Sequence, residues 1–343
     1  KKTLSKSLLF SMNGAPYRVI LLIILFLGKQ SLIDSIMIEA CDNNPWFTKS
    51  NVKYALFALV HMLNSDFLNS FSSSYSFSNS KKRIGVIVPS NIPLVGFYDF
   101  FCVLLTGNIF IGQLSTSNKI LLPFIARLLC DFNPGFKKLI FFKDYLVDID
   151  MLIVTGNDNT AQYFDYHYNL IPKLIRKHRT SIGVINGSEE MTDYVKLSDD
   201  IFRYFGLGCR NISKLFIPRD FDLNKLKEPF LQYQDVLSHS EYMDNYRYQK
   251  VLCHLNDINY IDFESILLIE SNKISSPISV LYYQYYDDIS LLRNVFNKLD
   301  KSIQCIVSGD AMIVNSIHFG DTQKPTLYDF PDGVDVIKFI LEN

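Results

Sequence analysis

The chain has 343 residues, 48% of them hydrophobic, which is enough for a large core and about two domains of ordinary size. Its 34 lysine and arginine residues nearly balance its 35 aspartate and glutamate residues, so no whole-chain field favours nucleic acid or an anionic membrane. The six cysteines and six histidines show no C-x-x-C or H-x-x-x-H spacing. This spread argues against a zinc site or a disulfide framework and favours a reducing, cytoplasmic location.

Residues 1–80 are predicted to form a helical segment that ends in a linker. The apolar run VILLIILFLG at 19–28 is shorter than the roughly 18–20 residues that span a bilayer. A buried helix is favoured there over a signal peptide, because no small-residue cleavage site follows. Pro45 breaks the helical pattern, and Thr48 or Ser50 is expected to cap the next helix. The serine-rich stretch at 71–80 is predicted to be an exposed loop.

Apolar strands then alternate with helices along the rest of the chain, which is typical of parallel sheets in α/β proteins. The first set has strands at 83–88, 108–114, 138–142 and 151–154, with helices at 93–105 and 119–131. The second set has strands at 181–185, 213–217, 265–269, 278–284 and 303–307, with helices at 198–204, 223–239, 241–255 and 288–299. Two α/β lobes that meet near residue 180 are therefore expected.

Three turns are predicted just beyond the carboxyl ends of strands, where an open α/β sheet binds ligands: the turns at 89–93 and 155–157 and the turn that contains Cys209. Asn91 lies between two prolines in the turn PSNIP at 89–93. A rigid side-chain amide there suits the stabilisation of an oxyanion, and a helix cap is the structural alternative. The turn TGN at 155–157 opens a helix whose backbone amides would favour a pyrophosphate, although it lacks G-x-G-x-x-G.

Cys209 follows two glycines and is flanked by Arg203 and Arg210. The glycines allow a tight turn and close approach of a ligand, and the arginines would favour the thiolate. Cys209 is therefore a candidate nucleophile, with a buried apolar cysteine as the alternative.

The order and spacing of these turns resemble the aldehyde dehydrogenase superfamily. Its P-W-N-x-P, A-G-N, K-P-S, F-T-G-S and G-Q-x-C motifs are similar to PSNIP at 89–93, TGN at 106–108, QLS at 113–115, VTGN at 154–157 and GLGC at 206–209. Longer segments are similar to the luminescence-type fatty acyl-CoA reductases, in the form common in Bacteroidetes-like bacteria. These segments are NIPLVGF at 91–97, DIFRYFGLGCRN at 200–211 and LYDFPDGVD at 327–335. The resemblance covers 35–343.

The resemblance implies an aldehyde dehydrogenase-like α/β fold with two Rossmann-like parallel-sheet lobes and the active site between them. The implied domains are an NAD(P)-binding lobe at 81–180, a catalytic thiol lobe at 181–315 and a C-terminal segment at 316–343 that returns to the cofactor lobe. Cys209 would be the nucleophile, and Asn91 and the Cys209 N–H would be the oxyanion donors. The cofactor would contact Pro89, Ser90, Gln113, Ser115, Thr155, Gly156 and Asn157.

The implied reaction reduces a long-chain fatty acyl-CoA with NADPH, or alternatively NADH, to the fatty aldehyde through an acyl-thioester on Cys209. The implied partners are the acyl-CoA or another acyl donor, acyl-activating subunits, and further copies of the chain in a homo-oligomer. No metal, nucleic acid or membrane span is expected.

Three departures from the superfamily pattern bear on this reading. The stretch TSIGVING at 180–187 lacks the glutamate that activates water in aldehyde-oxidising members, and its loss suits an enzyme whose acyl intermediate must survive until hydride arrives. Gln113 stands where a lysine usually binds the adenosine ribose or its 2′-phosphate, so it supplies no charge for NADPH. The stretch KISSP at 273–277 lacks the acid that holds the nicotinamide ribose, as is usual in acyl-CoA reductases.

Two rival functions follow from the same residues. One is an oxidising, CoA-independent aldehyde dehydrogenase with Glu190 as the base, although helix-cap or surface roles are favoured for Glu189 and Glu190. The other is a degraded paralogue that binds acyl groups or a partner. The basic run at 173–179 is interpreted as a solvated helix end, with a contact to CoA phosphates as the alternative.

Overall fold

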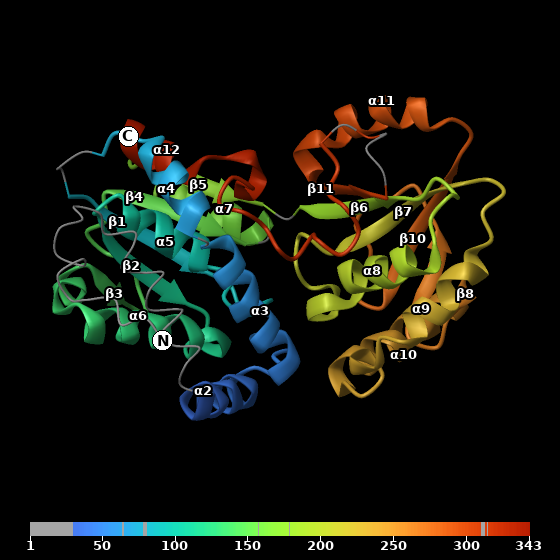
Figure 1. The fold of residues 1–343 in the computed structure, drawn as a ribbon, viewed down its shortest axis with the longest axis horizontal. Coiled ribbons are helices and arrows are strands. Elements are labelled where there is room, and N and C mark those ends of the chain that lie inside the picture. Colours follow the sequence, from blue (N-terminus) through green and yellow to red (C-terminus); the bar gives the residue numbers. More distant parts are fainter. Residues whose placement is uncertain are drawn as a thin grey trace. The chain divides into compact units, whose positions relative to one another are not determined.

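The computed structural model describes residues 30–63, 65–77, 81–156, 158–177, 179–309, 313 and 315–343. The helix expected at 19–28 lies outside these residues. The chain divides into two compact units, unit 1 (1–177 and 326–343) and unit 2 (178–325). Each unit contains one β-sheet with helices packed on it (Figure 1).

Sheet A, in unit 1, has five parallel strands in the order β3-β2-β1-β4-β5. The strands are β1 (Arg83–Val88), β2 (Ile109–Leu114), β3 (Ile140–Phe142), β4 (Met151–Thr155) and β5 (Lys173–Arg176). The chain moves from β1 to β3 in one direction and then from β4 to β5 in the other. The strand order therefore reverses between β1 and β4, which in open α/β sheets creates a crevice beyond the carboxyl ends of the strands.

Helices cover both faces of sheet A. Phe100 of α5 packs edge-on against Phe110 of β2 at 4.9 Å between ring centroids, whereas Phe164 of α7 packs with Ile111 of β2. Neighbouring strand residues point to opposite faces, so α5 and α7 lie on opposite sides. The helices of unit 1 are α2 (Gln30–Asn43), α3 (Lys49–Met62), α4 (Ser65–Ser73), α5 (Phe97–Leu105), α6 (Leu121–Phe132), α7 (Asp158–His167) and α12 (Val336–Glu342), with short 3₁₀ turns η1 (Thr116–Asn118), η2 (Pro134–Lys138) and η7 (Pro331–Gly333).

Sheet B, in unit 2, has six strands in the order β11-β6-β7-β10-β9-β8. The strands are β6 (Thr180–Val184), β7 (Ile212–Pro218), β8 (Ile261–Asp262), β9 (Leu267–Glu270), β10 (Val280–Tyr286) and β11 (Ile303–Ser308). Every pair is parallel except β8 with β9, which is antiparallel. Sheet B is therefore mixed rather than wholly parallel, because the short β8 returns to β9 through a tight turn.

Unit 2 contains α8 (Met191–Phe202), α9 (Lys227–Leu231), α10 (Ser240–Leu255) and α11 (Ile289–Leu299), with 3₁₀ turns η3 (Arg203–Gly206), η4 (Leu223–Leu226), η5 (Gln234–Val236) and η6 (Asp300–Ser302). Leu292 and Phe296 of α11 pack on Ile182 of β6. Tyr246 of α10 packs with Leu267 of β9. These contacts bury the apolar faces of both helices against the sheet.

Several expected boundaries were wrong for identifiable reasons. α4 extends to Ser73 and buries Phe71 completely, so the serine-rich stretch is not wholly a loop. α5 begins at Phe97 rather than at residue 93, since Leu94 has a left-handed φ of 59°. The helix expected at 223–239 is broken into η4, α9 and η5. Thr48 caps α3, as expected, by accepting a hydrogen bond from the backbone N–H of Asn51 at 3.1 Å.

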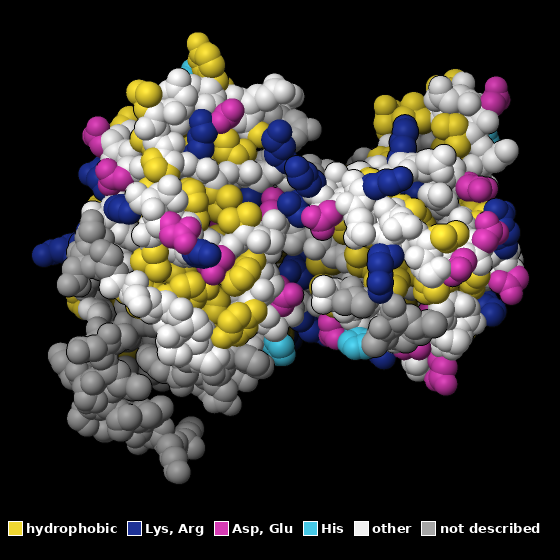
Figure 2. Space-filling model, turned by 90° about the horizontal axis from the view of Figure 1, so that it is seen from above, with side chains coloured by type: hydrophobic (Ala, Val, Ile, Leu, Met, Phe, Trp, Pro, Cys, Tyr) yellow, Lys and Arg dark blue, Asp and Glu magenta, His cyan; other side chains and the backbone are white. Residues whose placement is uncertain are grey.

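The first four residues of the basic run at 173–179 are not a helix end. Residues Lys173–Arg176 form strand β5, which was not predicted. Within the described ranges, every helix is too short or too polar to cross a lipid bilayer. Basic and acidic side chains are interspersed over the face of the surface in Figure 2, as the balanced composition implies.

Candidate active site

The carboxyl edge of sheet A brings together most of the residues expected to bind the cofactor. Pro89 and Ser90 follow β1, Ser115 follows β2, and Gly156 follows β4. The Ser115 N–H donates to the carbonyl of Val88 at 3.2 Å, which joins the ends of β1 and β2. Gln113 and Thr155 lie at the ends of β2 and β4 themselves, and Asn157 lies outside the described residues.

Two buried asparagines fix the turn after β1. The amide of Asn118 donates to the carbonyl of Pro89 at 2.6 Å, and the amide of Asn44 donates to the carbonyl of Ser90 at 2.9 Å. Each asparagine is 3% exposed. Asn91, at the next position, is partly exposed. The turn is therefore held from two sides, which is what a preorganised hydrogen-bond donor requires.

The carboxyl edge of sheet A also has features that fit a bound dinucleotide. Helix α7 starts at Asp158, two residues beyond Gly156, so its first backbone amides lie near the end of β4, in the arrangement that binds phosphate in other α/β proteins. A side chain on Gly156 would come within 2.7 Å of Thr160, so only glycine allows this close turn. The Oδ1 atom of Asn118 is buried and accepts no hydrogen bond from the described residues, which leaves an acceptor beside Pro89. These features fit a bound NAD(P)(H).

A buried ion pair between Arg176 and Asp99 stabilises the carboxyl edge of sheet A. The sequence analysis did not predict this pair. Both guanidinium Nη atoms of Arg176 donate to the carboxylate of Asp99, at 2.7 and 2.8 Å, and the two side chains are each 5% exposed. Nη1 also lies 3.3 Å from the hydroxyl of Thr155. Since the carbonyl of Arg176 accepts from the Gly156 N–H at 3.2 Å, the pair fixes the turn after β4. No sequence signal links Arg176 to Asp99, which is 77 residues away.

In unit 2, Cys209 is exposed, in a turn between η3 and β7. Its exposure excludes the buried alternative. The turn follows α8 and η3 and precedes β7, so the expected position beyond the carboxyl end of a strand was wrong. Ser181 of β6 donates to the carbonyl of Cys209 at 2.9 Å. Arg203 is paired with Asp199 and lies 5.4 Å from the centre of the Tyr233 ring. The structure thus places the thiol on an anchored turn and one flanking arginine in a local ion pair.

The two acidic residues after β6 make main-chain contacts. The carboxylate of Glu189 accepts from the N–H groups of Asn186 and Gly187, at 2.7 and 2.9 Å. Glu190 is the N-cap of α8, and its N–H donates to the carboxylate of Asp193 at 3.2 Å. The expected helix-cap role of Glu190 is confirmed, and Glu189 closes the turn that precedes the helix.

Lys214 is a buried cation that the sequence does not reveal as unusual. It is 1% exposed, and its ammonium donates to the carbonyl of Ser271 at 2.9 Å and to the side-chain oxygen of Gln284 at 2.6 Å. It also lies 4.8 Å from the centre of the Phe216 ring. Burial lowers the pKa of Lys214 to about 8.

The depressed pKa of Lys214 predicts a pH-dependent stability. Between about 8 and the ordinary value of 10.5, the folded protein releases this proton while the unfolded chain keeps it, so stability rises with pH. Below about 8 both states are charged and the full cost of burial is present. The wild-type protein should therefore gain roughly 3 kcal/mol relative to Lys214→Met across this window. Urea unfolding at several pH values measures the difference.

The matched control is Lys225→Met, which removes an exposed ammonium from η4. Its stability should follow the wild-type pH curve. If the Lys214→Met curve ran parallel to the wild-type curve, the pKa of Lys214 would not be depressed.

Several solved structures with a similar fold are aldehyde dehydrogenases. The aldehyde dehydrogenase KauB from Pseudomonas aeruginosa matches with a TM-score of 0.66 and 13% identity, over 88% of this chain and 72% of that one. An aldehyde dehydrogenase from Bacillus cereus, solved as an NAD⁺ complex, matches with a TM-score of 0.61 and 12% identity, over 85% and 70%. An NAD-dependent benzaldehyde dehydrogenase from Corynebacterium glutamicum matches with a TM-score of 0.60 and 11% identity, over 86% and 76%.

No family model matches the chain, and no curated protein sequence matches it. At these identities the structural similarity shows the fold alone. The chain has the aldehyde dehydrogenase-like α/β fold, as expected from its sequence.

Proposed function

We propose that this protein is an NAD(P)-dependent oxidoreductase that acts at the aldehyde level, and specifically an acyl-CoA reductase that converts a long-chain fatty acyl-CoA to the fatty aldehyde. The observation that carries the proposal is the exposed thiol of Cys209 on its anchored turn. The aldehyde dehydrogenase-like fold and the dinucleotide-compatible edge of sheet A support it.

The chemistry assigned to the chain's own residues is acyl transfer. The Cys209 thiolate attacks the thioester carbonyl, and the Asn91 amide and the Cys209 N–H donate to the oxyanion; removing such a donor typically costs about 10²–10³ in rate. CoA leaves as its thiolate and takes up a proton. A bound NAD(P)H would supply hydride to the acyl carbon. The resulting thiohemiacetal then collapses to the aldehyde and regenerates the Cys209 thiolate.

The reductive direction is favoured by the environment of Glu189 and Glu190. Both residues are occupied with the turn and the helix start after β6, whereas aldehyde oxidation needs a base that activates water on the acyl-enzyme. An acyl-enzyme without such a base survives long enough to accept hydride. We also propose that acyl-activating subunits feed the reaction and that the chain assembles as a homo-oligomer.

The test is a reduction assay over short-chain to long-chain acyl-CoAs with NADH and NADPH separately. Loss of NAD(P)H that depends on acyl-CoA and yields free CoA supports the proposal. Aldehyde oxidation by NAD⁺ without free CoA, abolished in Glu190→Gln, would instead identify an oxidising dehydrogenase. Acyl binding with no turnover of either kind would identify a degraded paralogue.

Gln113 gives a prediction about the coenzyme. A lysine at this position would add a charge that the 2′-phosphate of NADPH can bind, and charged hydrogen bonds contribute about 1.5–3 kcal/mol. Gln113→Lys should therefore tighten NADPH binding by about tenfold or more and leave NADH binding nearly unchanged. Quenching of Trp46 fluorescence measures both dissociation constants. Equal effects on the two coenzymes would place Gln113 away from the adenosine ribose.

A further inference from the structure

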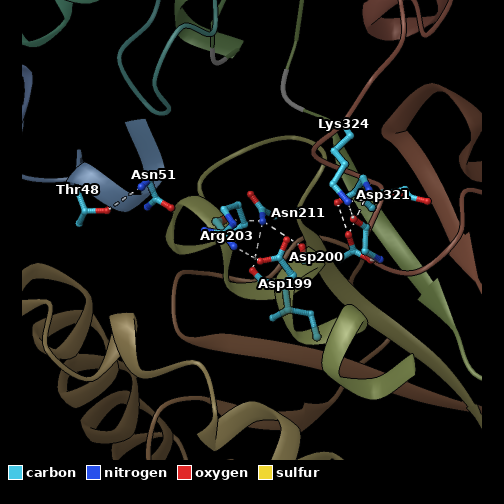
Figure 3. A network of polar contacts seen from close by, with 11 residues as sticks. Thr48, Asn51, Asp199, Asp200, Arg203, Asn211, Asp321 and Lys324 are labelled. Atoms are coloured by element: carbon cyan, nitrogen blue, oxygen red, sulfur yellow. Dashed lines mark hydrogen bonds and ion pairs between the residues drawn. The ribbon is translucent and has the colours of Figure 1, made fainter. Parts of the chain in front are cut away.

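Asn211 ties the backbone around Cys209 together from inside the fold. Its side chain is buried, at 2% exposed. The Oδ1 atom accepts from the N–H of Gly208 at 2.9 Å. The Nδ2 atom donates to the carbonyls of Arg203 at 2.8 Å, Asp200 at 3.0 Å and Ile201 at 3.4 Å. Figure 3 shows this amide pointing toward the backbone at the end of α8, beside Asp199, Asp200 and Arg203.

The backbone that Asn211 spans is in an unfavourable conformation. Tyr204, Phe205 and Gly206 have consecutive left-handed φ angles of 53°, 59° and 74°. Two of these residues are not glycine, and bulky side chains rarely occupy this region unless the surrounding structure holds them there. The contacts of Asn211 to Arg203 and Gly208 lie on either side of the three residues, so they hold the turn closed at both ends.

A second set of contacts fixes the end of α8 that Asn211 binds. The carboxylate of Asp200 accepts from the N–H of Gly320 at 2.6 Å and from the N–H and hydroxyl of Thr322 at 3.2 and 2.7 Å. Arg210 donates to the carbonyl of Thr322 at 3.3 Å. The residues on both sides of Cys209 are thus tied to one rigid frame, and the exposed thiol lies on it.

We propose that Asn211 is a positioning residue: it fixes the turn so that the Cys209 thiol and N–H face the reacting carbonyl together. The inference rests on the proposed function, because it concerns the geometry of acyl transfer to Cys209. A displacement of about 1 Å in such a site can cost about 10² in rate. The amide of Asn211 supplies both the acceptor for the Gly208 N–H and the donors for the carbonyls of Asp200, Ile201 and Arg203.

The test compares two rates and the apparent KM for acyl-CoA between Asn211→Ala and the wild-type protein. Acylation of Cys209 by a radiolabelled long-chain acyl-CoA should fall about 100-fold. Alkylation of Cys209 by iodoacetamide, which needs the thiolate but no oxyanion donor, should change by less than about threefold. The apparent KM for acyl-CoA should also stay nearly constant, since Asn211 has no role in binding the CoA.

The control for lost stability is Asp262→Asn. Asp262 binds Tyr246 and Lys250 of α10, at 2.6 Å each, and none of these partners belongs to the Cys209 turn. This variant should lose thermal stability yet acylate at the wild-type rate. Two outcomes would overturn the positioning role and indicate a general loss of stability instead. One is that Asp262→Asn acylates as slowly as Asn211→Ala. The other is that alkylation of Asn211→Ala falls in parallel with its acylation.

Asn211→Asp adds a pH signature. The introduced carboxyl group can replace both the donor and the acceptor only when it is protonated. Its acylation rate relative to wild type should therefore rise as the pH falls, and a flat ratio would contradict the inference. Should the wild-type protein itself fail to acylate while iodoacetamide still labels Cys209, the proposed function fails and the positioning role falls with it.

Discussion

Replacement of Cys209 by alanine is expected to abolish acyl-enzyme formation and to lower turnover by about 10⁴-fold or more, as loss of a nucleophile does in other acyl-transfer enzymes. The side chain is exposed, so the melting temperature should hardly change, since substitutions at such positions are usually within about 0.5 kcal/mol. Single-turnover labelling with radiolabelled acyl-CoA and a thermal melt measure the two effects. An alanine variant that still carried the label would exclude Cys209 as the nucleophile.

Cys130→Ala is the matched control, because Cys130 is only partly buried on α6. Burial raises the pKa of the Cys130 thiol, and likewise those of Cys41, Cys102 and Cys253. These thiols should therefore react slowly with iodoacetamide, whereas Cys209 should react first. Cys130→Ala should label and turn over like the wild-type protein. If prior acylation protected Cys209 from iodoacetamide, acylation and alkylation would be shown to occur at the same thiol.

Asp99→Asn is expected to destabilise the protein by about 3–5 kcal/mol, because it leaves the buried guanidinium of Arg176 without a carboxylate. The two side chains are each 5% exposed and share two hydrogen bonds. Since Arg176 also contacts Thr155 at 3.3 Å, NAD(P)H binding should weaken as well. Urea unfolding and fluorescence titration with NADH measure the two losses.

Two control variants test whether the loss of stability in Asp99→Asn comes from the burial of an unpaired charge. Asp144→Asn breaks an exposed pair with Lys119, whose side chains are 82% and 48% exposed, and it should cost less than about 1 kcal/mol. The double variant Asp99→Leu with Arg176→Met should be less destabilised than Asp99→Asn, because no unpaired charge remains. If Asp99→Asn cost no more than Asp144→Asn, the buried pair would not hold the edge of sheet A.

Much of the architecture could be predicted because its signals are local. The apolar run at 83–88 became β1 with the expected bounds, and Thr48 became the cap of α3. β5 was missed because its four residues, with two basic side chains among them, resemble a solvated surface. Arg176, at the end of β5, is buried only because Asp99 of helix α5 neutralises its charge. Propensity and periodicity carry no information about such a distant partner.

The sequence alone determined that strands alternate with helices, that an amide follows a predicted strand and that a thiol follows two glycines, because those patterns depend on neighbouring residues. Only the tertiary structure decided which side chains hold the turns. Asn211 and Asn118 read as ordinary polar residues, yet each is buried and fixes a turn through main-chain hydrogen bonds. The reason is physical: a buried amide donates to whichever backbone carbonyls the fold brings near it, and the tertiary structure decides which carbonyls those are.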